Sequence, residues 1–216
     1  MKLVIIDRDG TLNPVAEDFV TSADEWTALP GALEAIARLN HAGWHVVVAT
    51  NQPGLGRGLF DVMALNGIQA KLNRQLAAVG GRVDAVFYCP HAADENCTCR
   101  KPAPGLLEQI CERFGAERQD VQVVGSCADH VQAGAALGAR LHLVCIGQSA
   151  HVTASEPLPP GLPLGTRLHA SLNDFVDHLL PVVQVSTAST APLVIATPNE
   201  PPLPVLLHGA SHPIAT

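Results

Sequence analysis

The stretch that decides the fold is Leu3-Val4-Ile5-Ile6-Asp7-Arg8-Asp9-Gly10-Thr11-Leu12-Asn13, residues 3–13. Its first four residues are apolar and mostly β-branched, which predicts a buried strand of a parallel sheet. The polar run therefore emerges at the carboxyl end of the strand, where open α/β sheets place their chemistry. Asp7 and Asp9 crowd two carboxylates into one turn, which is costly unless a cation or a proton offsets them. The pattern favours a divalent metal site with Asp7 as nucleophile and Asp9 as acid/base. The alternative is an acidic loop that caps the next element.

The composition indicates a soluble globular chain, since 47% of its 216 residues are hydrophobic and 15% are charged. No apolar run approaches the ~20 residues that a bilayer requires, and the apolar run before Asp7 is too short for a signal peptide. We therefore expect a cytoplasmic protein with no membrane partner. The net charge of −7 argues against nucleic acid as a partner but allows a small anionic substrate.

The rest of the chain alternates helical and strand patterns. Residues 31–42 have a helical apolar face, and Val46-Val47-Val48-Ala49 reads as a second buried strand, which makes a right-handed βαβ unit. Further helices are predicted at residues 61–79, 103–114, 129–137 and 170–180, the last with Ser171 as N-cap, and further strands at 84–88, 121–124 and 141–146. The predicted fold class is α/β, a doubly wound parallel sheet.

Two loops are predicted to lie at the same edge as Asp7. Residues 13–26 lack periodicity and should cover the end of the first strand, so that Val15, Ala16, Glu17 and Asp18 touch the ligand. The second strand ends in the glycine-rich run of residues 50–58, in which the Thr50 hydroxyl and free backbone amides are suited to phosphate oxygens and Arg57 adds a charge. An ordinary turn is the alternative for this run.

Four residues have the spacing of a zinc site: Cys89, His91, Cys97 and Cys99. Three thiolates and one imidazole complete a tetrahedral shell without an open position, so this Zn²⁺ would be structural. A disulfide is the alternative. Cys111, Cys127 and Cys145 stand singly in apolar contexts and are predicted to be core residues.

Arg100 and Lys101 follow the Cys/His loop directly, and that loop would carry them to the sheet edge. The Lys101 ammonium would offset charge on a phosphoryl group and on the nucleophile, while the forked donors of Arg100 suit a second phosphate or a sugar. The alternative is a solvated basic pair before a helix.

With these motifs assembled, the chain resembles the haloacid-dehalogenase superfamily, in its branch of D,D-heptose 1,7-bisphosphate and histidinol phosphatases. The resemblance covers residues 1–180 and is carried by the runs 7–13, 50–58, 89–91 and 97–102. It implies a phosphatase without a large cap domain in which Asp7 attacks phosphorus, Asp9 protonates the leaving oxygen and later activates water, and Mg²⁺ bridges carboxylate and phosphate. It also implies phosphate-holding roles for Thr50 and Lys101 and substrate recognition by Arg100.

The substrate that the resemblance implies is D-glycero-D-manno-heptose 1,7-bisphosphate, which loses its 7-phosphate on the way to nucleotide-heptose and lipopolysaccharide core. Histidinol phosphate is the alternative substrate. We expect a monomer whose substrate-binding residues are Asp7, Arg8, Asp9, Val15, Ala16, Glu17, Asp18, Thr50, Asn51, Gln52, Pro53, Arg57, Arg100 and Lys101.

The chain departs from the superfamily pattern at the fourth motif, which normally reads Gly-Asp with another acid four residues later. Those positions are Ser126 and His130 here. A serine hydroxyl can ligate Mg²⁺ but brings no charge, and Asp9 would lend only its backbone carbonyl, so Asp7 remains the one anionic ligand. We expect weaker Mg²⁺ binding and reduced or absent activity, unless Asp129 contributes through a water. A phosphate-binding protein without turnover is therefore the second hypothesis.

Beyond residue 180 the composition changes. Residues 181–216 contain seven prolines and no Lys or Arg. We therefore expect a phosphatase domain over residues 1–180 and an extended tail over 181–216.

Overall fold

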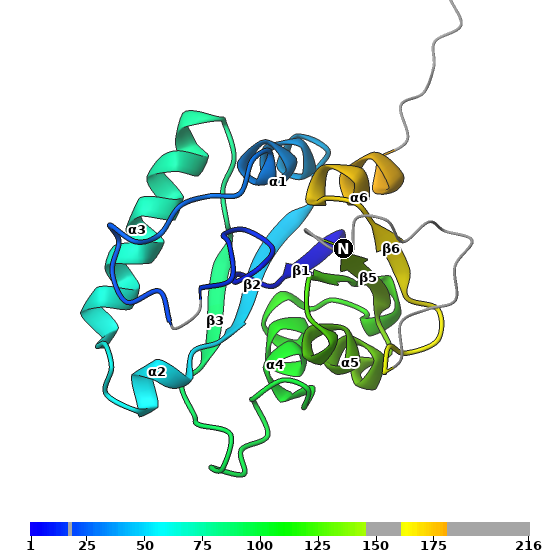
Figure 1. Ribbon diagram of the computed structural model, residues 1–216. Coiled ribbons are helices and arrows are strands. Elements are labelled where there is room, and N and C mark those ends of the chain that lie inside the picture. Colours follow the sequence, from blue (N-terminus) through cyan, green and yellow to red (C-terminus); the bar gives the residue numbers. More distant parts are fainter. Residues whose placement is uncertain (17–18, 146–160, 181–216) are drawn as a thin grey trace, which may run out of the picture. The chain divides into compact units, whose positions relative to one another are not determined.

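The structure is a computed structural model that describes residues 1–16, 19–145 and 161–180 (Figure 1). In these ranges six parallel strands form one sheet in the order β3-β2-β1-β4-β5-β6. The strands are β1 (Leu3–Ile6), β2 (His45–Asn51), β3 (Ala85–Cys89), β4 (Gln122–Gly125), β5 (Arg140–Val144) and β6 (Arg167–His169). The parallel sheet confirms the predicted fold class.

The β1 strand lies in the interior of the sheet, and all four of its side chains are buried. It pairs with β2 on one side and with β4 on the other. Val4 and Ile6 belong to one core cluster, whereas Leu3 and Ile5 belong to a second cluster, so the strand contributes to a core on each face of the sheet. This double burial is the reason for the continuous apolar run.

The helices are divided between the two faces, as Figure 1 shows. The first core cluster includes residues of α1, α3 and α6, and the second includes residues of α4 and α5. The helices are α1 (Ala32–His41), α2 (Pro53–Gly56), α3 (Val62–Ala78), α4 (Gly105–Phe114), α5 (Ala128–Leu137) and α6 (Leu172–Leu179), with a 3₁₀ turn, η1, at Arg118–Asp120. The sheet is therefore doubly wound.

The helices and strands that the sequence predicts are all present, and their described ends differ from the predicted ones by at most two residues. Ser171 caps α6 as predicted, because its hydroxyl accepts from the backbone N of Asp174 at 3.1 Å. Three short elements were not predicted, namely α2 inside the glycine-rich loop, the 3₁₀ turn η1 and the three-residue strand β6. All three are shorter than the stretch over which a helical or an alternating pattern can be recognised.

Some predictions fall outside the described residues. These are the ligand contacts of Glu17 and Asp18, the end of the last predicted strand at Ile146, and the extended tail over residues 181–216. The two-domain division stays a prediction. Within the described ranges, no helix combines the length and the apolar character that crossing a membrane would take.

Candidate active site

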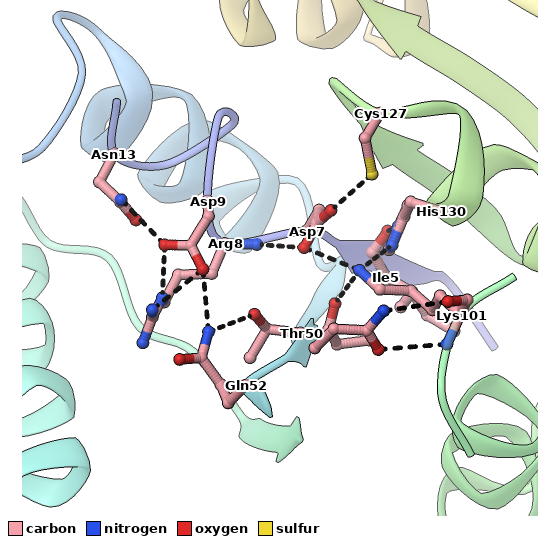
Figure 2. Close-up of polar contacts among 12 residues, drawn as sticks. Ile5, Asp7, Arg8, Asp9, Asn13, Thr50, Gln52, Lys101, Cys127 and His130 are labelled. Atoms are coloured by element: carbon pink, nitrogen blue, oxygen red, sulfur yellow. Dashed lines mark hydrogen bonds and ion pairs between the residues drawn. The ribbon is translucent and has the colours of Figure 1, made fainter. Parts of the chain in front are cut away.

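The carboxylate of Asp7 lies directly after β1, at the carboxyl edge of the sheet, and is 5% exposed (Figure 2). Its Oδ1 atom accepts from the backbone N of Arg8 at 2.9 Å and lies 2.8 Å from Nζ of Lys101. Its Oδ2 atom accepts only from Sγ of Cys127, at 3.2 Å, among the described residues. Because a thiol is a weak donor, Oδ2 is the freer oxygen and the better nucleophile.

The charge of this carboxylate is stabilised by its neighbours. Burial alone would raise the pKa of Asp7, but the charge of Lys101, with a smaller contribution from the hydrogen bond of Cys127, outweighs burial and holds the pKa below its ordinary value. Asp7 is therefore ionised at neutral pH, as a nucleophile must be.

Asp9 is held by four hydrogen bonds. Its two oxygens accept from Nε and Nη2 of Arg8, each at 3.0 Å, from Nδ2 of Asn13 at 3.0 Å and from Nε2 of Gln52 at 2.8 Å. Asn13 is oriented in turn by Nε1 of the fully buried Trp26, which donates to Asn13 Oδ1 at 3.1 Å. No role was predicted for Asn13 or Trp26 from the sequence. The signal available for Asn13 was its place four residues after Asp9, in the same turn.

Thr50 and Asn51 stand at the end of β2, next to β1. The Thr50 hydroxyl accepts from Nε2 of Gln52 at 2.9 Å, which leaves its hydrogen to donate to an oxyanion. Asn51 forms a reciprocal pair with the backbone of Lys101, with distances of 3.0 and 3.1 Å. Asn51 thus fixes the main chain that carries the ammonium group.

Lys101 is almost completely buried, at 2% exposure. Its ammonium nitrogen contacts Oδ1 of Asp7 at 2.8 Å, the backbone oxygen of Ala49 at 2.9 Å and Nδ1 of His130 at 3.0 Å. A buried charge requires such partners. The predicted pairing of Lys101 with the nucleophile is thus the geometry that the structure shows.

The fourth-motif residues lie between β4 and the first turn of α5. Ser126 is half-buried and its hydroxyl packs against Gly10, where an added Cβ would come within 2.3 Å of Oγ. His130 is fully buried, and burial together with the charge of Lys101 lowers its pKa to about 3. Asp129 is exposed. His130 therefore adds no charge to the site.

The prediction that Cys127 is a core residue is wrong. Cys127 is the N-cap residue of α5, half-buried, and its thiol contacts the nucleophile. Burial raises the pKa of this thiol to about 12, and the Asp7 carboxylate adds to the rise, so the group stays a neutral donor. Cys111 and Cys145 are buried, as predicted. The apolar residues around Cys127 in the sequence could not reveal that the turn between β4 and α5 faces Asp7.

The three residues predicted to hold Mg²⁺ would offer it a carboxylate oxygen of Asp7, the backbone carbonyl of Asp9 and the hydroxyl of Ser126. All are hard oxygen donors, which Mg²⁺ prefers. The set fits this ion in chemical type, and it supplies one formal negative charge.

The Cys/His loop forms a compact cluster whose four ligand atoms all lie within 4.8 Å of one another. The three sulfur atoms are 3.3, 3.6 and 3.7 Å apart, and Nδ1 of His91 lies 3.5 Å from Cys89 Sγ and 3.3 Å from Cys99 Sγ. Thiolates bound at about 2.3 Å in a tetrahedral shell stand roughly 3.8 Å apart. The cysteines are free, so the cluster fits one Zn²⁺ and not a disulfide.

A cavity of about 240 Å³ opens beside Asp9. Eight of the predicted substrate-binding residues line it, namely Arg8, Asp9, Val15, Ala16, Asn51, Gln52, Pro53 and Arg100. Phe19 and Val20 complete its described lining, and Arg57 is instead exposed at the C-cap of α2. The cavity thus has in its lining both Asp9, the predicted acid/base, and Arg100, the side chain predicted to recognise substrate.

A larger and more open hollow, of about 870 Å³, lies along α2 and the start of α3. Its lining has one charged residue, Asp61, whose carboxylate caps α3. Without a cation in its described lining, this hollow is poorly suited to a phosphate, and the smaller cavity beside Asp9 is the candidate site.

The fold and this edge define the class of protein. The haloacid dehalogenase-like hydrolase family matches residues 15–138, and the chain belongs to this family.

Named relatives narrow the class. The chain is 48% identical over 180 residues to D-glycero-beta-D-manno-heptose-1,7-bisphosphate 7-phosphatase of Bordetella bronchiseptica, a match that covers 83% of this chain and 98% of the relative. The Pseudomonas aeruginosa protein of the same name is 42% identical over 159 residues, covering 74% and 89%. A crystal structure of the B. bronchiseptica D,D-heptose 1,7-bisphosphate phosphatase with magnesium and phosphate has a TM-score of 0.76 at 47% identity, covering 83% and 98%. The chain therefore falls among heptose bisphosphate phosphatases, as the resemblance indicated.

Proposed function

We propose that the protein is a Mg²⁺-dependent phosphatase that removes the 7-phosphate of D-glycero-D-manno-heptose 1,7-bisphosphate. The observation that carries this proposal is the buried Asp7 carboxylate, whose Oδ1 is bound to Lys101 while its Oδ2 is left nearly free. The relatives at 48% and 42% identity bear the name of this activity.

The reaction proceeds in two steps on Asp7. Oδ2 attacks phosphorus as the bond to the sugar oxygen breaks, and Asp9 gives its proton to that leaving oxygen. Asp9 then takes a proton from the water that attacks the aspartyl-phosphate, which releases inorganic phosphate and restores Asp7. Asp9 accepts hydrogen bonds from Arg8, Asn13 and Gln52. It must give up some of these bonds in order to carry a proton and to contact the substrate.

Asp7, the Asp9 carbonyl and Ser126 would hold Mg²⁺, which neutralises phosphate charge near the nucleophile when bound. The Thr50 hydroxyl donates to a phosphoryl oxygen, and the charge of the Lys101 ammonium offsets negative charge on the phosphoryl group.

The Cys/His loop positions the cationic groups. Arg100 donates from Nη1 to the backbone oxygen of His91 at 3.2 Å, so its guanidinium is attached to the loop that Zn²⁺ would fix. The presence of Arg100 in the cavity lining supports its assignment to the second phosphate of a bisphosphate. We propose a cytoplasmic monomer that serves nucleotide-heptose and lipopolysaccharide core synthesis.

The test is phosphate release from the purified protein with Mg²⁺, comparing the heptose bisphosphate with histidinol phosphate. We expect faster hydrolysis of the bisphosphate, and an Arg100→Gln variant should lose that preference by raising KM for it. Equal rates on both substrates in the two proteins would contradict the proposed substrate.

The neutral residues Ser126 and His130 favour a second candidate, a phosphate-binding protein without turnover. Beryllofluoride with Mg²⁺ separates the two, because a phosphatase forms the adduct on Asp7. Failure to form it, together with absent phosphate release, would support the second candidate.

A further inference from the structure

The side chain of His130 faces two different partners. Its Nδ1 atom lies 3.0 Å from Nζ of Lys101, and its Nε2 atom lies 3.3 Å from the backbone oxygen of Ile5. An ammonium group can only donate, and a carbonyl oxygen can only accept. Nδ1 must therefore be the unprotonated atom and Nε2 must carry the hydrogen, which defines one neutral tautomer.

The ammonium of Lys101 has three hydrogens and meets three acceptors, on Asp7, Ala49 and His130. Two of these partners are neutral, so Asp7 is its one carboxylate partner among the described residues. A carboxylate in place of His130 would compete for the same charge. The neutral imidazole orients the Lys101 ammonium without pairing with its positive charge, so that this charge is paired with the Asp7 carboxylate.

The fold leaves room for this ring. An added Cβ on Gly125 would lie 2.8 Å from Cδ2 of His130 and 3.1 Å from Cβ of Asp7. The missing side chain at the end of β4 thus allows the imidazole and the nucleophile to approach the same backbone position.

We propose that His130 is a positioning residue for the phosphatase reaction: as a neutral acceptor through Nδ1, it holds the Lys101 ammonium against Asp7. The proposal rests on the proposed function for the role of Lys101. It assigns to His130 a hydrogen bond and not a charge, and it explains how an edge that lacks an acid at this position keeps its lysine ordered.

Two amide variants separate this role from a structural one. His130→Asn places an oxygen near Nδ1 and keeps the acceptor for Lys101, whereas His130→Gln reaches the Nε2 position and keeps the donor for Ile5. A hydrogen bond to a charged group is worth a factor of roughly 10 to 100. We expect His130→Gln to lower kcat by about that factor with little change in KM, and His130→Asn to retain most of kcat. Equal kcat in two folded variants would overturn the proposal.

Nitrogen NMR of the wild-type imidazole gives a readout that does not depend on activity or on the folding of the variants. At neutral pH we expect the tautomer protonated at Nε2. A ring protonated at Nδ1, or at both nitrogens, would overturn the proposal. If the wild-type protein hydrolysed no sugar phosphate, the proposed function would fail, while the tautomer would still decide the arrangement assigned to His130.

Discussion

Two groups of buried titratable side chains lie at different places on the sheet, and one group is charged whereas the other is neutral. At the carboxyl edge, Asp7 and Lys101 are buried as a charged pair 2.8 Å apart. Between β5 and β6, His142 and His169 are buried at 3% and 5% exposure, with Nδ1 of His142 2.9 Å from Nε2 of His169. We call these two histidines the histidine pair.

The histidine pair is neutral. Burial, with a further contribution from neighbouring positive charge, lowers the pKa of His142 to about 3. Burial also lowers the pKa of His169 to about 4, although Asp174 partly opposes it. The difference teaches that a buried group keeps its charge where an opposite charge adjoins it, and loses it where hydrogen bonds between neutral groups suffice. His130 is also neutral, although it lies at the carboxyl edge beside the charged pair of Asp7 and Lys101, which we call the charged edge.

The largest effect is expected from Asp7→Asn, which removes the nucleophile from the charged edge. Phosphate release should fall by about a thousandfold or more, measured with the heptose bisphosphate and Mg²⁺. Asp24→Asn, at an exposed carboxylate, is the control and should leave the rate unchanged. Undiminished hydrolysis by the Asp7 variant would remove the basis of the mechanism.

The next effect concerns the support of the charged edge by the Cys/His loop. A Cys97→Ser, Cys99→Ser double variant should lose bound Zn²⁺ and lower kcat/KM by roughly 10- to 100-fold, because Lys101 follows this loop. Metal analysis and kinetics measure both. Cys111→Ala, outside the loop, should retain zinc. A variant without zinc but with full activity would show that Lys101 keeps its position without the zinc-bound loop.

The histidine pair makes stability depend on pH. The ordinary histidine pKa is near 6.5 and applies to the unfolded chain, whereas the folded values are lower. As pH falls the unfolded state therefore binds protons first. The stabilisation is complete above pH 6.5 and is lost toward pH 4, by roughly 2 kcal/mol per histidine at pH 5.

Urea unfolding at pH 7.5 and pH 5 measures this loss. His142→Gln should reduce the difference in unfolding free energy between the two pH values, whereas His41→Gln, at an exposed histidine, should not. The same pH dependence in wild type and His142→Gln would mean that the pair does not govern acid stability.

Ser126→Asp tests whether the charged edge is short of an anion. A second carboxylate beside Asp7 should raise Mg²⁺ affinity by about tenfold, measured by calorimetry without substrate. Ser126→Asn matches it in shape without the charge and should show little gain. Equal affinity in the Asp variant and the wild type would contradict the idea that charge limits Mg²⁺ binding here.

The smallest effect is expected at Cys127. Cys127→Val removes the donor to Asp7 Oδ2 and should change kcat by a factor of about 2 to 10, since a thiol is a weak donor even to a carboxylate. Cys127→Ser keeps a donor and should stay closer to wild type. If both variants matched the wild-type kcat, the thiol would be a bystander.

Much of the fold was predictable because its signals are local. Continuous apolar runs such as Leu3–Ile6 mark strands that are buried on both faces, and the Ser171 cap lies within its own helix. Parallel strands bring their carboxyl ends to one edge, so the placement of Asp7 and Thr50 at the same edge also followed from the sequence. The zinc cluster was predictable because its four ligands lie within eleven residues, 89–99.

Other features depend on contacts that no local pattern encodes. His130 contacts Lys101 and Ile5, which lie 29 and 125 residues away in the chain. Cys127 contacts Asp7, which lies 120 residues away. Such side-chain contacts depend on the register of the strands and on the rotation of each helix about its axis.

The sequence by itself determined the strands, the metal-binding loop and the chemical groups gathered at one edge, because these follow from residue type and spacing. Only the tertiary structure decided which atom of each group faces which partner, because a hydrogen bond between distant segments exists only after the sheet and its helices have packed.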